Sequence, residues 1–222
     1  SGSSGMGKNA LINELHRFIT VHQGIFIRGK LDQYDQHSPY SAIKQALRAW
    51  ITYALALESD QLTSMQNTLR QTLGNNARVL VDFIPEMETV LGALSEVPSL
   101  SVMESQSRLN QALCQFVQSI SQVQPLVLFL DDLQWADQGT LELIQNLMQN
   151  GEGRFLILLA YRENEVDSTH PTSIALEHIA SLRTLRLAAL APSEILKLLS
   201  DVLHLDSDKV APLASLVKEK TK

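Results

Sequence analysis

A glycine-rich stretch at the start of the chain has the spacing of a phosphate-binding loop. Its candidate ligand-binding residues, in the pattern G-x-x-x-x-G-K, are Gly2, Gly5, Gly7, Lys8 and Asn9. Glycines let the backbone turn tightly and direct successive N–H groups at phosphate oxygens, and a helix beginning near Lys8 adds its positive end. Lys8 is predicted to neutralise the β- and γ-phosphates of a nucleotide. Asn9 stands where a Mg²⁺-binding hydroxyl is usual, so the loop predicts nucleotide binding more firmly than hydrolysis.

Two adjacent acidic residues follow a run of large apolar residues. Residues 126–130 read Leu-Val-Leu-Phe-Leu and lead directly into Asp131 and Asp132. An apolar run without alternation is typical of a parallel strand covered on both faces. At the end of such a strand, Asp131 is predicted to hold Mg²⁺ through water, and Asp132 to polarise an attacking water. The alternative is that one of the two acids caps the following turn.

A third candidate residue, Arg162, comes directly after the apolar run 155–161. We predict that it reaches the same sheet edge as Asp131 and senses the γ-phosphate. A surface arginine that begins a loop is the alternative. Arg28 and Lys30 lie near the same edge, and we interpret both as solvated loop charges.

Composition argues against several other classes of protein. The chain has 222 residues, of which 45% are apolar and 19% charged, and this length suits one compact domain or one domain with a small appendage. Its net charge of −6 argues against direct nucleic-acid binding. Cys114 is the single cysteine, so an internal disulfide and a cysteine-based metal cluster are excluded. The apolar runs are far shorter than the roughly 20 residues that span a bilayer, and no signal-peptide pattern is seen. We therefore expect a cytoplasmic protein with no membrane partner.

Strand and helix patterns alternate along the chain. Strands are predicted over residues 24–29, 126–130 and 155–161, with a weaker, alternating one over 182–190. Helices are predicted over residues 10–22, 41–57, 140–149, 174–181, 192–203 and 206–218, and over 60–122 with breaks at Gly74, Pro85 and Pro98. This order predicts a three-layer α/β fold with a parallel sheet. We assign residues 1–190 to a core with a helical insertion at about 60–122, and residues 191–222 to the start of a helical lid.

The chain resembles the AAA-like ATPase modules of bacterial multi-sensor signalling kinases, which belong to the STAND branch of P-loop ATPases. The resemblance is carried by residues 1–16, 24–33, 39–42, 131–137 and 159–166. In that family a serine/threonine kinase domain usually precedes the ATPase, and GAF and histidine-kinase domains often follow it. The resemblance implies a P-loop ATPase fold, ATP and Mg²⁺ as ligands, and a nucleotide-driven switch. The implied partners are other domains of a larger signalling protein and, depending on nucleotide, further copies of the same module.

The family's site residues transfer to matching positions of this sequence. The Walker A matches are Gly2, Gly7 and Lys8, the Walker B match is Asp131, the water-polarising acid is Asp132, and the arginine after the sensor strand is Arg162. Residues 1–5 also look like a linker left by an expression vector, with Met6 as a start codon. The family's Ser-Gly-x-Ser-Gly-x-Gly-Lys stretch favours a native loop instead.

Three departures from the family qualify these expectations. Asn9 replaces the hydroxyl that normally ligates Mg²⁺, which puts hydrolysis in doubt. The strand that leads into the loop in the family is not among the 222 residues, and the family continues beyond Lys222 into a Gly-Asn-Pro segment and a winged-helix region. We therefore expect a piece excised from a longer protein, with the first strand of its sheet missing.

Two other functions stay open at this stage. A non-catalytic interaction scaffold that holds nucleotide without hydrolysing it is favoured by Asn9. The sequence at residues 131–137, Asp-Asp-Leu-Gln-Trp-Ala-Asp, also suits the ATPase module of a STAND transcription regulator or a nucleotide cyclase. Flanking sequence would decide between those parents and a kinase.

Overall fold

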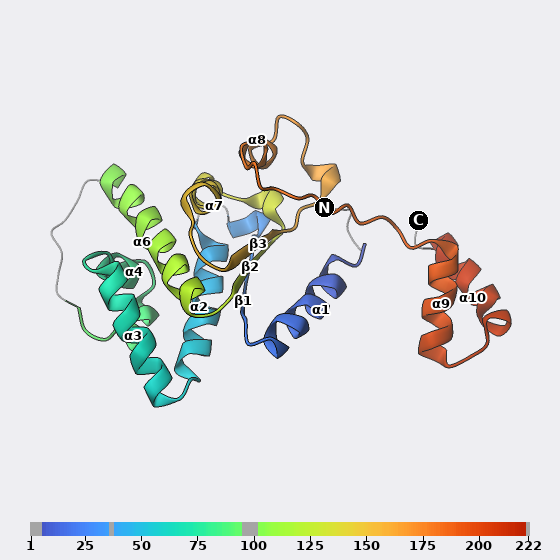
Figure 1. Ribbon diagram of the computed structural model, residues 1–222. Coiled ribbons are helices and arrows are strands. Elements are labelled where there is room, and N and C mark those ends of the chain that lie inside the picture. Colours follow the sequence, from blue (N-terminus) through green and yellow to red (C-terminus); the bar gives the residue numbers. More distant parts are fainter. Residues whose placement is uncertain (1–5, 36–37, 95–101, 221–222) are drawn as a thin grey trace.

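The computed structural model describes residues 6–35, 38–94 and 102–220 (Figure 1). One parallel sheet contains three strands in the order β1 (Ile25–Lys30), β2 (Leu126–Asp131) and β3 (Phe155–Leu159). Parallel neighbours need long crossover connections, and helices supply them here. The predicted α/β class and the three main strands are confirmed. β1 is shifted by one residue from the predicted range, β2 is one residue longer than predicted and β3 is two residues shorter.

Helices make up most of the remaining chain. They are α1 (Lys8–Val21), α2 (Ser41–Leu55), α3 (Ser59–Leu73), α4 (Asn76–Phe83), α5 (Glu88–Leu91), α6 (Val102–Val123), α7 (Gln138–Asn150), α8 (Pro171–Glu177), α9 (Pro192–Leu203) and α10 (Ser207–Lys220). The predicted breaks at Gly74 and Pro85 are confirmed, because Gly74 ends α3 with φ +49° and Pro85 begins a 3-10 turn. Pro98 lies outside the described residues.

One face of the sheet carries a thick helical cover. Residues of β1 and β2 that point to this face pack against α2 and α6, and Figure 1 shows α3 and α4 farther from the sheet. Trp50 of α2 is fully buried and meets Phe116 of α6 edge to face, with ring centroids 4.7 Å apart. The continuous core therefore lies between the sheet and the helices that connect β1 to β2.

The opposite face of the sheet is covered thinly by α1. His16 of this helix stacks on Phe26 of β1 at 4.6 Å between ring centroids. No residue of α1 is fully buried, however, and Leu156 of β3 remains 47% exposed. The helix that carries the glycine-rich loop is thus held by much less packing than α2.

The weak strand predicted over residues 182–190 is wrong. These residues form no strand, and a largely apolar cavity of about 370 Å³ lies between residues 182–187, the edge of β3 and the apolar side of α1. A strand needs a neighbouring strand to satisfy its N–H and C=O groups, and alternating side chains cannot replace that partner. Residues 182–190 therefore add no strand to the sheet of β1, β2 and β3.

The edge of β3 gives a testable expectation. Ala160 donates its N–H to the carbonyl of Leu130 at 2.9 Å, so alternate residues of β3 face β2 and the N–H groups of Ile157 and Leu159 point the other way. We expect the amides of Ile157 and Leu159 to exchange with solvent faster than that of Leu158, measured residue by residue by NMR. Equal protection would show that another segment forms hydrogen bonds along this edge.

Helices α9 and α10 pack on each other and stand away from the sheet at the end of an extended segment (Figure 1). Both helices confirm the sequence prediction. Treating residues 191–222 as the start of a lid remains a prediction. Among the residues described, no helix combines the length and apolar character that a membrane span requires.

Candidate functional site

A polar hollow of about 340 Å³ opens at the carboxyl edge of the sheet. It is lined by Met6, Gly7, Lys8, Asn9, Lys30, Asp131, Asp132 and Arg162. The structure thus brings together the described residues of the predicted loop, both predicted aspartates and the predicted arginine. Gly2 and Gly5 lie outside the described residues.

The loop side of the hollow is the start of α1. Gly7 precedes this helix with φ +79° and ψ 14°, a left-handed conformation that glycine adopts without the steric penalty of a side chain. Its carbonyl accepts the N–H of Leu11 at 3.1 Å, which closes the first turn. The first turn of α1 has no acidic residue, so the N–H groups at the start of this helix and the charge of Lys8 together favour an anion in the hollow.

Asp131 forms the floor of the site and has a partner that the sequence did not predict. Its side chain is 7% exposed, and its Oδ2 lies 3.0 Å from Nη2 of Arg28. Arg28 belongs to β1 and also lies over the Phe129 ring, 5.4 Å from the centroid. The interpretation of Arg28 as a solvated loop charge is therefore wrong: the parallel register sets it beside the end of β2.

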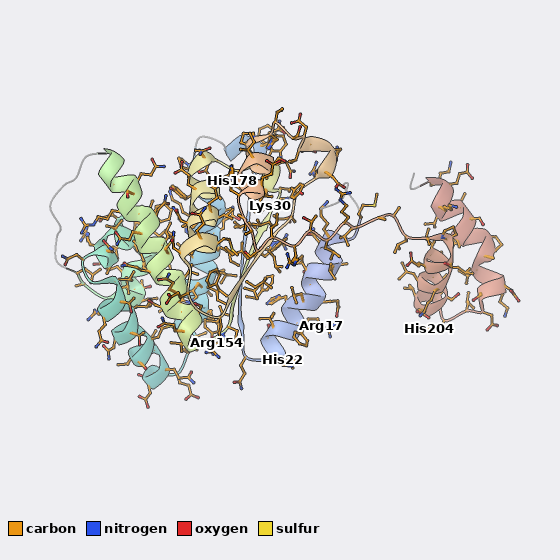
Figure 2. All side chains as sticks on the ribbon, turned by 45° about the horizontal axis from the view of Figure 1, so that its top comes forward. Arg17, His22, Lys30, Arg154, His178 and His204 are labelled. Atoms are coloured by element: carbon orange, nitrogen blue, oxygen red, sulfur yellow. The ribbon has the colours of Figure 1, made fainter. Side chains whose placement is uncertain are left out.

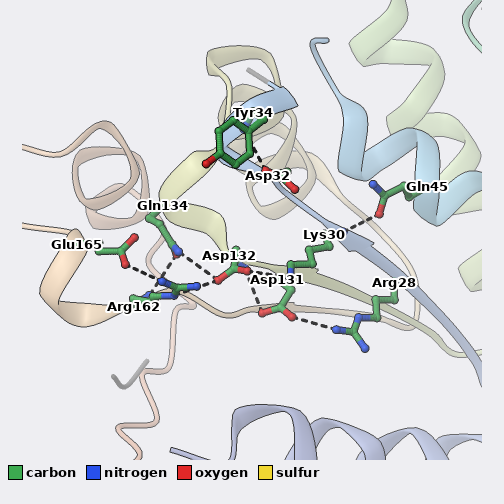
Figure 3. A network of polar contacts seen from close by, with 10 residues as sticks. All are labelled: Arg28, Lys30, Asp32, Tyr34, Gln45, Asp131, Asp132, Gln134, Arg162 and Glu165. Atoms are coloured by element: carbon green, nitrogen blue, oxygen red, sulfur yellow. Dashed lines mark hydrogen bonds and ion pairs between the residues drawn. The ribbon is translucent and has the colours of Figure 1, made fainter. Parts of the chain in front are cut away.

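Asp132 has a left-handed backbone conformation, and several groups contact its side chain (Figure 3). Its φ is +55°, a left-handed value uncommon for residues other than glycine, asparagine and aspartate. The side chain lies 3.5 Å from Nζ of Lys30 and 3.5 Å from Nε of Arg162. Lys30 is thus the second charge misassigned to a loop, because β1 extends through it and presents it to the site.

Arg162 connects the end of β3 to the hollow. Its Nη1 donates to Oε1 of Glu165 at 2.9 Å, and this hydrogen bond, with the charges of Glu165 and Asp132, raises the pKa of the guanidinium. Figure 3 shows the Arg162 side chain directed between these two carboxylates. It is therefore a permanent cation at the position where the sequence predicts a phosphate sensor.

Two residues of the turn after β2 make contacts that the sequence analysis did not predict. Gln134 contacts both Asp132 and Arg162. Asp137 begins α7, where its carboxylate accepts the N–H groups of Thr140 at 2.9 Å and Tyr40 at 3.1 Å. The Asp-x-x-Thr spacing is a helix-cap pattern that could have identified Asp137, whereas no local pattern identifies Gln134.

The oxygen donors at the hollow fit Mg²⁺ better through water than directly. Asp131 and Asn9 offer the carboxylate and amide oxygens that hard cations take. Direct binding at Oδ2 of Asp131 would displace Arg28, whereas a water-mediated contact would not. Across residues 6–35, 38–94 and 102–220, no three His, Cys, Asp or Glu side chains converge as a metal site. A cation here would therefore depend on water and phosphate oxygens, as Mg²⁺ commonly does.

Basic side chains outside the hollow lie on separate elements. Figure 2 places Arg17 and His22 along α1 and His204 at the far end with α9 and α10, whereas Lys30, which lines the hollow, lies at the sheet edge. The cations that surround Asp131 and Asp132 are consequently a local cluster contributed by β1 and the segment after β3.

The parallel sheet, the glycine before α1 and the acidic end of β2 define a P-loop type of nucleotide-binding fold. Residues 1–159 match the family model of the AAA ATPase domain, and the chain belongs to this family. The match includes Gly2 and Gly5 and ends before Arg162. Over 151 residues, the chain is 38% identical to hybrid signal transduction histidine kinase G of Dictyostelium discoideum. The matched region is 68% of this chain and 4% of that protein, and no solved structure matches significantly.

Proposed function

We propose that the chain is a nucleotide-dependent regulatory module that binds ATP with Mg²⁺ within a larger signalling protein. The observation that carries the proposal is the single hollow where the start of α1 faces Asp131, Asp132 and Arg162. The name of the Dictyostelium relative supports a signalling context, and a kinase parent in the cytoplasm is part of the proposal. The bacterial serine/threonine kinases of the sequence resemblance remain one candidate parent.

Each residue has a proposed role at this edge. The N–H groups at the start of α1 and the ammonium group of Lys8 bind the β- and γ-phosphates, while Asp131 and Asn9 orient a hydrated cation. Mg²⁺ bound there would neutralise charge that develops on the phosphate oxygens. Asp132 accepts a proton from the attacking water while the water oxygen forms a bond to the γ-phosphorus. The bond between the γ-phosphorus and the oxygen that bridges to the β-phosphate breaks, and ADP leaves. Arg162 stabilises the charge on the transferred group.

The same contacts suggest how the nucleotide acts as a switch. A γ-phosphate would compete with Asp132 and Glu165 for the guanidinium of Arg162, and its loss would return Arg162 to these carboxylates. Next to Arg162, Glu163 pairs with Arg186 at 3.1 Å, in the extended segment that leads to α9. A change at Arg162 can therefore reach α9 and α10, which are candidates for nucleotide-dependent contact with other domains or further copies.

A Lys8→Ala variant tests the ATP site. We expect its dissociation constant for ATP, measured by calorimetry with Mg²⁺, to rise at least roughly tenfold, since a hydrogen bond to a charged group contributes about 1.5–3 kcal/mol. Lys197→Ala, which removes an exposed lysine of α9, is the matched control and should leave the affinity unchanged. Unchanged ATP affinity in Lys8→Ala would refute the assignment of the site.

A non-catalytic scaffold is the second candidate, and Asn9 is the observation that favours it. An amide ligates Mg²⁺ at a different distance and angle from a hydroxyl, so binding can persist where turnover fails. Phosphate release separates the two proposals: Mg²⁺-dependent turnover by the unchanged chain excludes the scaffold. A transcription regulator or nucleotide cyclase as the parent protein would be identified by its flanking sequence.

A further inference from the structure

Gln134 joins the two proposed acting residues without lining the hollow itself. It lies in the 3-10 turn Leu133–Trp135 and is 4% exposed. Its Nε2 donates to Oδ1 of Asp132 at 3.1 Å, and its Oε1 accepts the main-chain N–H of Arg162 at 3.2 Å. Figure 3 shows this amide between the end of β2 and the segment after β3. One buried side chain therefore links two strands at their functional ends.

The two hydrogen bonds determine which way round the amide lies. The N–H of Arg162 can only donate and therefore needs the amide oxygen, while the carboxylate of Asp132 can only accept and therefore needs the NH₂ group. A reversed amide would oppose donor to donor and acceptor to acceptor. Because a buried amide without partners is costly, both contacts resist displacement together.

The Gln134 amide also determines which carboxylate oxygen of Asp132 is turned away from the hollow. Oδ1 is taken by Gln134 at 3.1 Å, a shorter contact than the 3.5 Å that separates each carboxylate oxygen from its cationic neighbour. Oδ2 remains on the side of Lys30, which lines the hollow. Fixing one oxygen thus directs the other toward the space where a phosphate and an attacking water would lie.

We propose that Gln134 is a positioning residue that keeps the carboxylate of Asp132 and the backbone of Arg162 in fixed relation for ATP hydrolysis. It acts through these two residues and does not touch the nucleotide. The inference rests on the proposed function, because it assigns Gln134 a part in the same reaction. Small displacements of acting groups can slow a reaction by roughly 100-fold, so the loss of this link should affect turnover far more than binding.

The test compares turnover and ATP affinity in the chain as it is. Gln134→Met keeps the length of the side chain but removes both hydrogen bonds, and Gln134→Glu keeps the acceptor for Arg162 while removing the donor to Asp132. We expect both to lower kcat roughly 10- to 100-fold, with the Kd for ATP changed by less than about threefold. Gln138→Met, at an exposed glutamine of α7, is the matched control and should leave kcat unchanged.

A double-mutant cycle distinguishes positioning from general support of the fold. If Gln134 works through Asp132, Gln134→Met should slow an Asp132→Asn variant little further, because residues that act as a unit are not additive. Additive losses, or an unchanged kcat in both Gln134 variants, would overturn the proposal. ATP binding by the unchanged chain without any turnover would overturn it and leave the binding site intact, whereas a failure of the chain to bind ATP would remove the proposed function as well.

Discussion

An Asp132→Asn variant should bind ATP nearly as tightly as the unchanged chain and hydrolyse it at least roughly 100-fold more slowly, within the range that a general base contributes. Asparagine cannot take the proton of the attacking water. It does preserve the local structure, because it tolerates the left-handed φ of +55° and can still accept the hydrogen bond from Gln134. The loss should therefore appear in kcat, measured as phosphate release at saturating ATP and Mg²⁺.

A second variant controls for the loss of one negative charge in Asp132→Asn. Asp206→Asn removes one negative charge from the connection between α9 and α10, far along the chain from β2, and should leave turnover unchanged. Retention of Mg²⁺-dependent turnover by Asp132→Asn would assign the proton to another acceptor. Calorimetry on the same samples separates slow chemistry from weak binding.

Substitution of Gly29 by alanine should have the largest effect on stability. A methyl group on Gly29 would overlap the carbonyl of Ala42 at the start of α2, and would lie 2.6 Å from its carbonyl carbon and 2.9 Å from its Cα. These are main-chain atoms, so no side-chain rotation relieves the contact. We expect a loss of about 3 kcal/mol in the free energy of unfolding, the upper end of typical overpacking costs.

Thermal and urea unfolding measure this loss. For a chain of this size, about 3 kcal/mol corresponds to a fall of roughly 6–12 °C in Tm. Gly24→Ala is the matched control, because its added methyl would meet the end of the Ile19 side chain at 2.7 Å and main-chain oxygens only at 3.3 Å. A Tm for Gly29→Ala equal to that of Gly24→Ala would contradict the close approach of α2 to β1.

Local patterns were sufficient for the strands and most helices, because apolar runs and glycine or proline breaks report backbone conformation directly. They were also sufficient to select Lys8, Asp131, Asp132 and Arg162 as residues of one edge, since parallel strands deliver their carboxyl ends together. Their individual roles in binding and hydrolysis remain predictions.

The partners of these residues could not be read from the sequence. Arg28 and Asp131 are 103 positions apart in the sequence, and only the register of β1 against β2 brings them together. Residues 182–190 failed as a strand for a related reason: their alternation is local, but a ladder requires a neighbour at hydrogen-bonding distance. Gln134 resembles any polar turn residue until the fold places Arg162 beside it.

Because α1 is held by little packing, its stability should depend strongly on whether a ligand is bound at the phosphate loop. A helix with no fully buried residue opens at a lower free energy than the core, so its amides should be among the least protected in the ligand-free chain. A ligand that binds only the closed form raises that opening energy by RT ln(1 + [L]/Kd), about 2.7 kcal/mol at 100 times Kd. Nucleotide binding would then stabilise α1 itself, without requiring any larger movement of the chain.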